Sequence, residues 1–201
     1  MPDAQLLTRL YRGELPSAEL PNRLDISSMA EDMNRLWQRS IAEIDRGQVI
    51  EWGAVLVVDS EGALQLKNAV AGTSGDVAIA VELSSGETLA GTFHTHPYED
   101  GTTGMPFSGT DIASALASGE NLSIVQSGDE VFALIRTEKT QSLEELAALI
   151  EEFNSAYTSY FNAGLSEQDA GIAANLDMCA KYGLAFYRGH ASGELRKVYG
   201  P

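Results

Sequence analysis

Apolar residues recur along this chain with two spacings, and each spacing predicts one type of element. Between residues 28 and 47 they recur every three or four positions, which indicates a helix with a single apolar stripe. Its stripe consists of Met29, Met33, Leu36, Trp37, Ile41 and Ile44. Ser28 and Glu31 form a capping-box pattern at its start, and Gly47 follows its end. We expect this helix to pack on a sheet, and binding of a partner is the alternative interpretation.

The segment before this helix predicts a short helix followed by an irregular arm. Residues 3–11 carry leucines at helical spacing, and Gly13 follows them. Residues 14–27 contain two prolines and are the one stretch that has the composition of a linker. We therefore divide the chain into an N-terminal arm, residues 1–27, and a domain, residues 28–201.

The middle of the chain has shorter apolar runs separated by turns that contain glycine, which is typical of strands. The predicted strands are residues 53–58, 63–70, 77–83, 88–94, 122–126 and 131–136, followed near the end of the chain by a hairpin of 184–187 and 194–199 with His190 in its turn. Their short connections favour antiparallel neighbours. Runs of strands between helices predict an α/β (α+β) fold: a single domain with a mixed, mostly antiparallel sheet flanked by helices.

Three further helices are predicted where a serine stands three residues before an acidic residue and an apolar run follows. The pairs are Ser108 and Asp111, Ser142 and Glu145, and Ser166 and Asp169, and the helices end at Gly119, Gly164 and Gly183. Cys179 lies on the apolar stripe of the last helix, so we expect it to be a core residue and not a nucleophile.

Composition indicates a folded and strongly acidic protein. At 201 residues with 44% hydrophobic residues, the chain suits one domain with a proper core. Its 13 basic and 29 acidic residues give a net charge of −16, which repels phosphate backbones, so we expect no nucleic acid as a partner. The charge favours a basic partner, although an acidic surface that maintains solubility explains it equally well. The apolar runs are too short for a signal peptide or a membrane span, and a single cysteine suits a reducing compartment, so we expect a cytoplasmic protein without membrane contact.

The most distinctive polar residues follow the predicted strand at 88–94. His94 and His96 are two of only three histidines, and their i, i+2 spacing places both side chains on one face of a strand. Asp111 begins the next apolar segment and can return a carboxylate to the same point. Two imidazoles and a carboxylate form a catalytic zinc set whose fourth position stays open to water. Taken singly, a histidine pair on a surface strand and a helix cap at Ser108 are simpler interpretations, but a cap and a ligand are compatible.

The combined pattern resembles the signature of the JAMM (MPN-type) zinc metallo-isopeptidases, which cut ubiquitin-like proteins from their conjugates. The matching residues are His94-Thr-His96-Pro and Ser108-Gly-Thr-Asp111. The resemblance implies that His94, His96 and Asp111 bind Zn²⁺ and that Ser108 polarises the carbonyl and supports the oxyanion. It covers about residues 48–136 and implies a fold like that of the JAMM and cytidine-deaminase families.

The resemblance also implies a glutamate from an upstream strand that activates water and later protonates the leaving amine. Glu51 is the first candidate because it precedes a glycine and an apolar run, as in the family. Glu82 is the second candidate, and its position before a Ser-Ser-Gly turn is also that of an ordinary solvated carboxylate. Two features depart from the family pattern. The segment between Pro97 and Ser108 is longer than usual, and Glu51 lies two residues before its glycine where many members have three.

The implied activity is zinc-dependent hydrolysis of the amide bond after the C-terminal tail of a ubiquitin-like protein, in deconjugation or precursor processing. Two alternatives remain: a non-catalytic binding scaffold of the MPN type, and a zinc peptidase that acts on a sulfur-carrier protein or an ordinary peptide. Residues 98–107, with two glycines and the apolar residues Met105, Pro106 and Phe107, either border the substrate channel or form an ordinary mobile loop.

Overall fold

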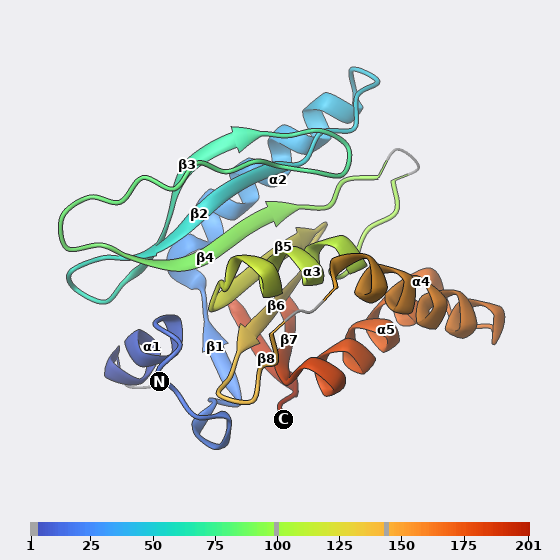
Figure 1. Ribbon diagram of the computed structural model, residues 1–201. Helices are drawn as coiled ribbons and strands as arrows, with labels where there is room; N and C mark the ends of the chain where they lie inside the picture. Colours follow the sequence, from blue (N-terminus) through green and yellow to red (C-terminus); the bar gives the residue numbers. More distant parts are fainter. Residues whose placement is uncertain (1–3, 99–100, 143–144) are drawn as a thin grey trace.

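Eight strands form one mixed sheet in the order β1-β8-β7-β6-β5-β4-β2-β3 (Figure 1). This computed structural model describes residues 4–98, 101–142 and 145–201, and the eight strands are those found among these residues. The strands are β1 (Arg23–Asp25), β2 (Trp52–Val58), β3 (Leu64–Ala71), β4 (Thr88–Thr95), β5 (Leu122–Ser127), β6 (Glu130–Arg136), β7 (Leu184–His190) and β8 (Glu194–Tyr199). All neighbours are antiparallel except β4 and β5, which are parallel. The predicted single domain with a mixed, mostly antiparallel sheet is confirmed.

Helices cover both faces of this sheet, with α2 on one face and α3, α4 and α5 on the other (Figure 1). The helices are α1 (Ala4–Tyr11), α2 (Ala30–Ile44), α3 (Gly109–Ser118), α4 (Leu146–Asn162) and α5 (Glu167–Tyr182), with 3-10 turns η1 (Ser17–Glu19) and η2 (Ser27–Met29). None of the described helices combines the length and apolar character that a membrane span needs.

The sheet separates two hydrophobic cores because successive strand residues point to opposite faces. On β6, Val131 and Ala133 join the core beneath α2, whereas Phe132 and Leu134 join the core beneath α3, α4 and α5. Cys179 is fully buried in the second core, as the sequence predicts. The predicted packing of α2 on the sheet is also confirmed, since the centre of its apolar stripe is buried.

Residues 14–27 differ from the expected arm because they pack against the domain. β1 pairs antiparallel with β8, and Leu24 is 1% exposed. The Tyr187 hydroxyl donates to the Pro21 carbonyl at 2.8 Å, and the Glu138 carboxylate accepts from both the backbone N–H and the hydroxyl of Ser17. These contacts join residues more than 100 positions apart, so the local proline pattern does not reveal them.

Residues 77–83 are not a strand of the sheet, and this prediction is wrong. The segment has no regular secondary structure, and Val77 and Ile79 pack instead over Gly53 of β2, where an added Cβ would lie 2.8 Å from Val77 Cγ2. Alternating apolar side chains favour an extended chain but do not determine which neighbour it pairs with. Here the side chains contact the face of the sheet, so the backbone does not join its edge.

Two of the predicted capping boxes do not form. The Ser28 hydroxyl donates to the Leu64 carbonyl at 3.2 Å, and α2 begins after η2 without a side-chain cap. α4 begins after Glu145, also without a side-chain cap, so Ser142 does not cap it. In contrast, Ser166 caps α5 as predicted, with its Oγ accepting from the Asp169 N–H at 3.1 Å. His190 also differs from the prediction: it is the last residue of β7 and does not lie in the turn, and it is exposed.

Candidate metal centre

The two histidines leave the sheet where β4 ends beside its parallel neighbour β5. His94 pairs with Gly53 of β2 on one side and with Val125 of β5 on the other. The His96 backbone N–H donates to the Gln126 carbonyl at 2.8 Å, so β5 holds the chain in place beyond the last residue of β4. The connection from β4 to β5 runs through α3. In such a unit, the carboxyl end of the strand and the start of the helix form a site for ligands.

Asp111 lies in the first turn of α3, where a reciprocal cap fixes its carboxylate. Ser108 Oγ accepts from the Asp111 N–H at 3.2 Å, and Asp111 Oδ2 accepts from the Ser108 N–H at 2.7 Å. The Ser108 hydroxyl also donates to Asp111 Oδ2 at 2.7 Å. The predicted cap is therefore present, and the capping carboxylate is the one that faces the histidines.

The donor atoms of these three side chains have the spacing of ligands around one ion. His94 Nε2 and His96 Nε2 are 3.0 Å apart, and they lie 3.4 Å and 3.2 Å from the nearest oxygens of Asp111. A tetrahedral ion with bonds of 2.0–2.1 Å separates its ligands by ~3.3 Å. The group of His94 and His96, both buried, and Asp111, which is half-buried, could therefore hold a metal ion.

A hydrogen bond selects the tautomer of His96 that a metal requires. His96 Nδ1 lies 3.1 Å from the carbonyl oxygen of Pro106, and a carbonyl only accepts. Neutral His96 therefore carries its proton on Nδ1, and its Nε2 lone pair points toward His94 and Asp111. Metal-binding histidines in proteins are oriented by this kind of second hydrogen bond.

Burial and charge act in opposite directions on the ionisable groups of this centre. Burial alone would raise the pKa of Asp111, but the two imidazoles hold it well below its usual value. Burial alone would lower the pKa of His94, and the Asp111 carboxylate outweighs that effect and raises it. Asp111 is consequently ionised at neutral pH, which is the form that binds a cation.

Glu51 is the upstream glutamate that the structure brings to the centre. It precedes β2, its backbone pairs with Gly72 and Thr73, and its side chain is buried. Burial raises the pKa of Glu51, although the neighbouring imidazoles act in the opposite direction. Glu82 is exposed on residues 77–83 and does not line the cavities around the centre.

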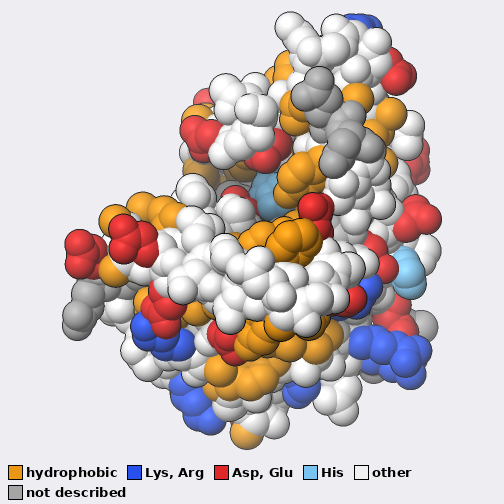
Figure 2. All heavy atoms as spheres, turned by 90° about the vertical axis from the view of Figure 1, so that its right-hand side faces the viewer, with side chains coloured by type: hydrophobic (Ala, Val, Ile, Leu, Met, Phe, Trp, Pro, Cys, Tyr) orange, Lys and Arg blue, Asp and Glu red, His pale blue; other side chains and the backbone are white. Residues whose placement is uncertain are grey.

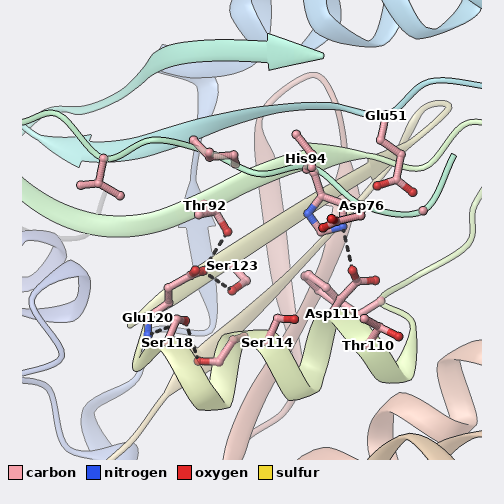
Figure 3. Close-up of a pocket in the computed structure, with 16 residues that line it drawn as sticks. Glu51, Asp76, Thr92, His94, Thr110, Asp111, Ser114, Ser118, Glu120 and Ser123 are labelled. Atoms are coloured by element: carbon pink, nitrogen blue, oxygen red, sulfur yellow. Dashed lines mark hydrogen bonds and ion pairs between the residues drawn. The ribbon is translucent and has the colours of Figure 1, made fainter. Parts of the chain in front are cut away.

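Two cavities, each of about 330 Å³, meet at the centre and share Glu51, Gly75, Thr110 and Asp111. The first cavity runs along β4 between α3 and residues 75–81 (Figure 3). The second is lined by Val49, Ser74, His96, Pro97, Tyr98 and Ser108 in addition to the shared residues. Figure 2 shows histidine at the bottom of the resulting hollow, with acidic and hydrophobic side chains around it. A chain that entered one cavity and left through the other would pass the centre.

The described part of the segment between the ligands is partly buried. Pro106 and Phe107 are buried, Met105 is half-buried, and the Phe107 ring makes an edge contact with the His94 ring. Asn175 of α5 donates to the Phe107 carbonyl at 2.8 Å, so the end of the loop is anchored. Residues 99–100 lie outside the described part of the chain.

The sequence analysis does not predict that three further residues, Asp76, Tyr98 and Thr95, lie near the centre. Asp76 and Tyr98 line the cavities, and they are brought there by loops whose course no spacing predicts. Thr95 lies on the opposite face of β4, fully buried, where its Oγ1 accepts from the Trp52 N–H at 2.9 Å and bonds Ser40 Oγ at 2.7 Å. Thr95 thereby ties the residue after Glu51 to the strand that carries the histidines. Because successive side chains of a strand point to opposite faces, the position of Thr95 between His94 and His96 predicts that its side chain points away from the centre.

Comparison with known proteins identifies no family for this chain, because no protein-family model, curated protein or solved structure matches it.

Proposed function

We propose that this protein is a zinc-dependent isopeptidase or peptidase that hydrolyses the amide bond after the C-terminal tail of a ubiquitin-like protein. The observation that carries the proposal is the tetrahedral spacing of His94, His96 and Asp111 beside a buried glutamate, Glu51, in one cleft. The sequence resemblance to the JAMM (MPN-type) isopeptidases supplies the substrate class.

Zinc suits this donor set because two imidazoles, one carboxylate and an open fourth position are the ligands of catalytic zinc. Bound zinc supplies Lewis acidity, which polarises a carbonyl and makes water a stronger nucleophile near neutral pH. A binding scaffold has no need of a buried ligand set, so these residues favour an enzyme over the alternative of a non-catalytic MPN-type module.

The chain supplies the proton transfer and the orientation of the substrate. Glu51 accepts a proton from the attacking water and passes it to the leaving amine, and its raised pKa brings it closer to the pH at which it works. Ser108 is exposed at the second cavity beside Asp111. Its hydroxyl donates to the oxygen of the scissile carbonyl after turning away from Asp111.

Residues 77–83 give the first cavity an edge that can hold an extended tail. Within the described chain, the backbone groups of this segment make no hydrogen bonds to other backbone groups. An extended peptide is bound by pairing with such an edge. Val77 and Ile79 line the same cavity and narrow it, which favours glycine next to the scissile bond.

The test compares two fusions of a ubiquitin-like protein that differ in the last two residues of the tail, Gly-Gly in one and Leu-Leu in the other. The proposal predicts that the zinc-loaded protein cleaves directly after Gly-Gly and loses most of its activity on Leu-Leu. Equal cleavage of both fusions would indicate a general zinc peptidase. Binding of the Gly-Gly fusion without cleavage would indicate a scaffold.

A further inference from the structure

A buried pair of hydroxyl groups lies behind the metal centre, on the face of the sheet that α2 covers (Figure 1). Ser40 of α2 and Thr95 of β4 are both fully buried, and their hydroxyl oxygens are 2.7 Å apart. The other buried residues of α2 are apolar, namely Met33, Leu36 and Trp37. A buried hydroxyl among apolar side chains is costly unless it makes a hydrogen bond, so the bond to Thr95 explains how Ser40 is accommodated there.

This pair reaches Glu51 through the peptide group that joins Glu51 to Trp52. Thr95 Oγ1 accepts from the Trp52 N–H at 2.9 Å, and the Gly72 N–H donates to the Glu51 carbonyl at 2.8 Å. That N–H and that carbonyl belong to one planar unit. Hydrogen bonds therefore hold the unit on both sides, and they fix the backbone from which the Glu51 side chain extends.

The place of Thr95 in the sheet makes its hydroxyl a link between the proposed base and the proposed ligands. Backbone pairing of β2 with β4 ends at Gly53 and His94. One residue further along β4, the Thr95 hydroxyl bonds to the start of β2, whereas the backbone N–H of His96 donates to β5. Because side chains alternate along a strand, Thr95 points to α2 while the two histidines on either side of it point to the cleft. Thr95 can therefore set the distance between Glu51 and the histidines from the opposite face of the sheet.

We propose that Thr95, held in place by Ser40, is a positioning residue that keeps the Glu51 carboxylate beside the metal ligands. The inference deepens the proposed function and takes from it the role of Glu51. Thr95 contacts neither substrate nor reacting atoms, and it acts through the peptide group between Glu51 and Trp52. Helix α2 then has a task besides packing, because its Ser40 hydroxyl restrains the hydroxyl that makes the link.

Three substitutions separate this role from a contribution to stability alone. Thr95→Val has nearly the same shape but lacks the acceptor for the Trp52 N–H, whereas Thr95→Ser retains the hydroxyl. Thr140→Val is the matched control. Thr140 Oγ1 accepts from the Thr137 N–H at 2.8 Å, so this variant loses the same kind of bond, and Thr140 lines neither cavity of the centre.

The deciding experiment is a double-mutant cycle that uses zinc alone as its probe, with affinity measured by competition with a chromophoric chelator. In the wild-type background, Glu51→Gln should weaken zinc binding about fivefold, because it removes a negative charge near the ion. In the Thr95→Val background the same substitution should change the affinity by less than about twofold, and the Thr95→Ser and Thr140→Val backgrounds should retain the wild-type effect. An equal or larger effect in the Thr95→Val background, or no effect of Glu51→Gln in the wild-type background, overturns the inference.

Ser40→Ala takes the place of Thr95→Val in the cycle if that variant does not fold. It keeps the Thr95 hydroxyl and removes its partner on α2. The effect of Glu51→Gln on zinc affinity should again fall below the wild-type value. An undiminished effect in this background would mean that the two hydroxyl groups serve stability alone, which overturns the inference.

Kinetics on the Gly-Gly fusion separate failure of this inference from failure of the proposed function. Thr95→Val should lower kcat about tenfold and leave KM within about a factor of two, and Thr95→Ser should restore most of kcat. A diminished effect in the zinc cycle supports the inference even where the wild-type protein cleaves nothing, a result that would contradict the isopeptidase. Cleavage by the wild-type protein with an unchanged kcat for Thr95→Val overturns the inference alone, and a wild-type protein that binds no zinc overturns both.

Discussion

Glu51 is more deeply buried than Glu120, the other glutamate that lines the cleft, and than Glu82, which lies outside it. Burial is what distinguishes a general base from a surface charge. Glu51 is 8% exposed, whereas Glu120 is half-buried and Glu82 is exposed. Removing a carboxylate from water disfavours its charged form and raises its pKa. A base with a raised pKa holds the accepted proton long enough to deliver it to the leaving amine.

We therefore expect Glu51→Gln to keep the fold and the metal but to reduce turnover by ~10²–10⁴-fold, because glutamine has almost the same shape and cannot accept a proton. The matched control is Glu82→Gln, which should stay within a factor of two of wild type in the same assay. Steady-state hydrolysis together with the zinc content of each variant measures both effects. If Glu82→Gln is the inactive variant, the base comes from residues 77–83.

At the scale of elements, the first turn of α3 both stabilises the helix and carries residues with proposed roles in catalysis. Ser108 caps the helix and is hydrogen-bonded to the Asp111 carboxylate, whereas Ser166 caps α5 with the same local pattern away from the centre. The two serines thus form a matched pair. One provides only a helix cap, and the other provides a cap beside the proposed zinc ligand.

Ser108→Ala and Ser166→Ala should each lower the free energy of unfolding by about 1 kcal/mol, the usual contribution of a serine cap. Only Ser108→Ala should also lower turnover, because it removes the hydroxyl that supports the scissile carbonyl. Urea unfolding and steady-state kinetics on both variants measure this. Equal and small losses of activity would mean that Ser108 is a cap alone.

The elements that the sequence predicts well are those whose cause is local. The start of α3 follows from Ser108 and Asp111 three residues apart, and the shared face of His94 and His96 follows from strand alternation. The prediction of a strand at residues 77–83 is wrong because the neighbour of this segment is determined by packing over Gly53, which lies more than 20 positions earlier in the sequence. The approach of Glu51 to the histidines also depends on a distant pairing, that of β2 with β4, so it followed from the resemblance and not from spacing.

At the scale of the whole molecule, the N-terminal residues complete the sheet. β1 forms one edge, and Leu24 lies opposite Leu195 with both side chains buried. Burial of this kind is not expected of an arm. The first 27 residues should accordingly contribute to the stability of the domain, although they lie away from the metal centre in sequence.

Leu24→Ala should lower the free energy of unfolding by ~2–5 kcal/mol, the range for a leucine removed from a core. Val198→Ala on β8 is the control, because Val198 is 49% exposed and its loss should cost less than ~0.5 kcal/mol. Urea unfolding of the two variants provides the comparison. Similar small effects would restore the interpretation of residues 1–27 as an independent arm.

The zinc content of the purified protein tests the central claim most directly, because every proposed step depends on the ion held by His94, His96 and Asp111. Elemental analysis should find about one zinc per chain in the wild-type protein. His96→Ala should lose it, since a site with three protein ligands does not keep its affinity after removal of one. The matched control is His190→Ala, an exposed histidine on β7, which should keep the full zinc content. Absence of zinc from the wild-type protein, or full retention of zinc by His96→Ala, would contradict the account.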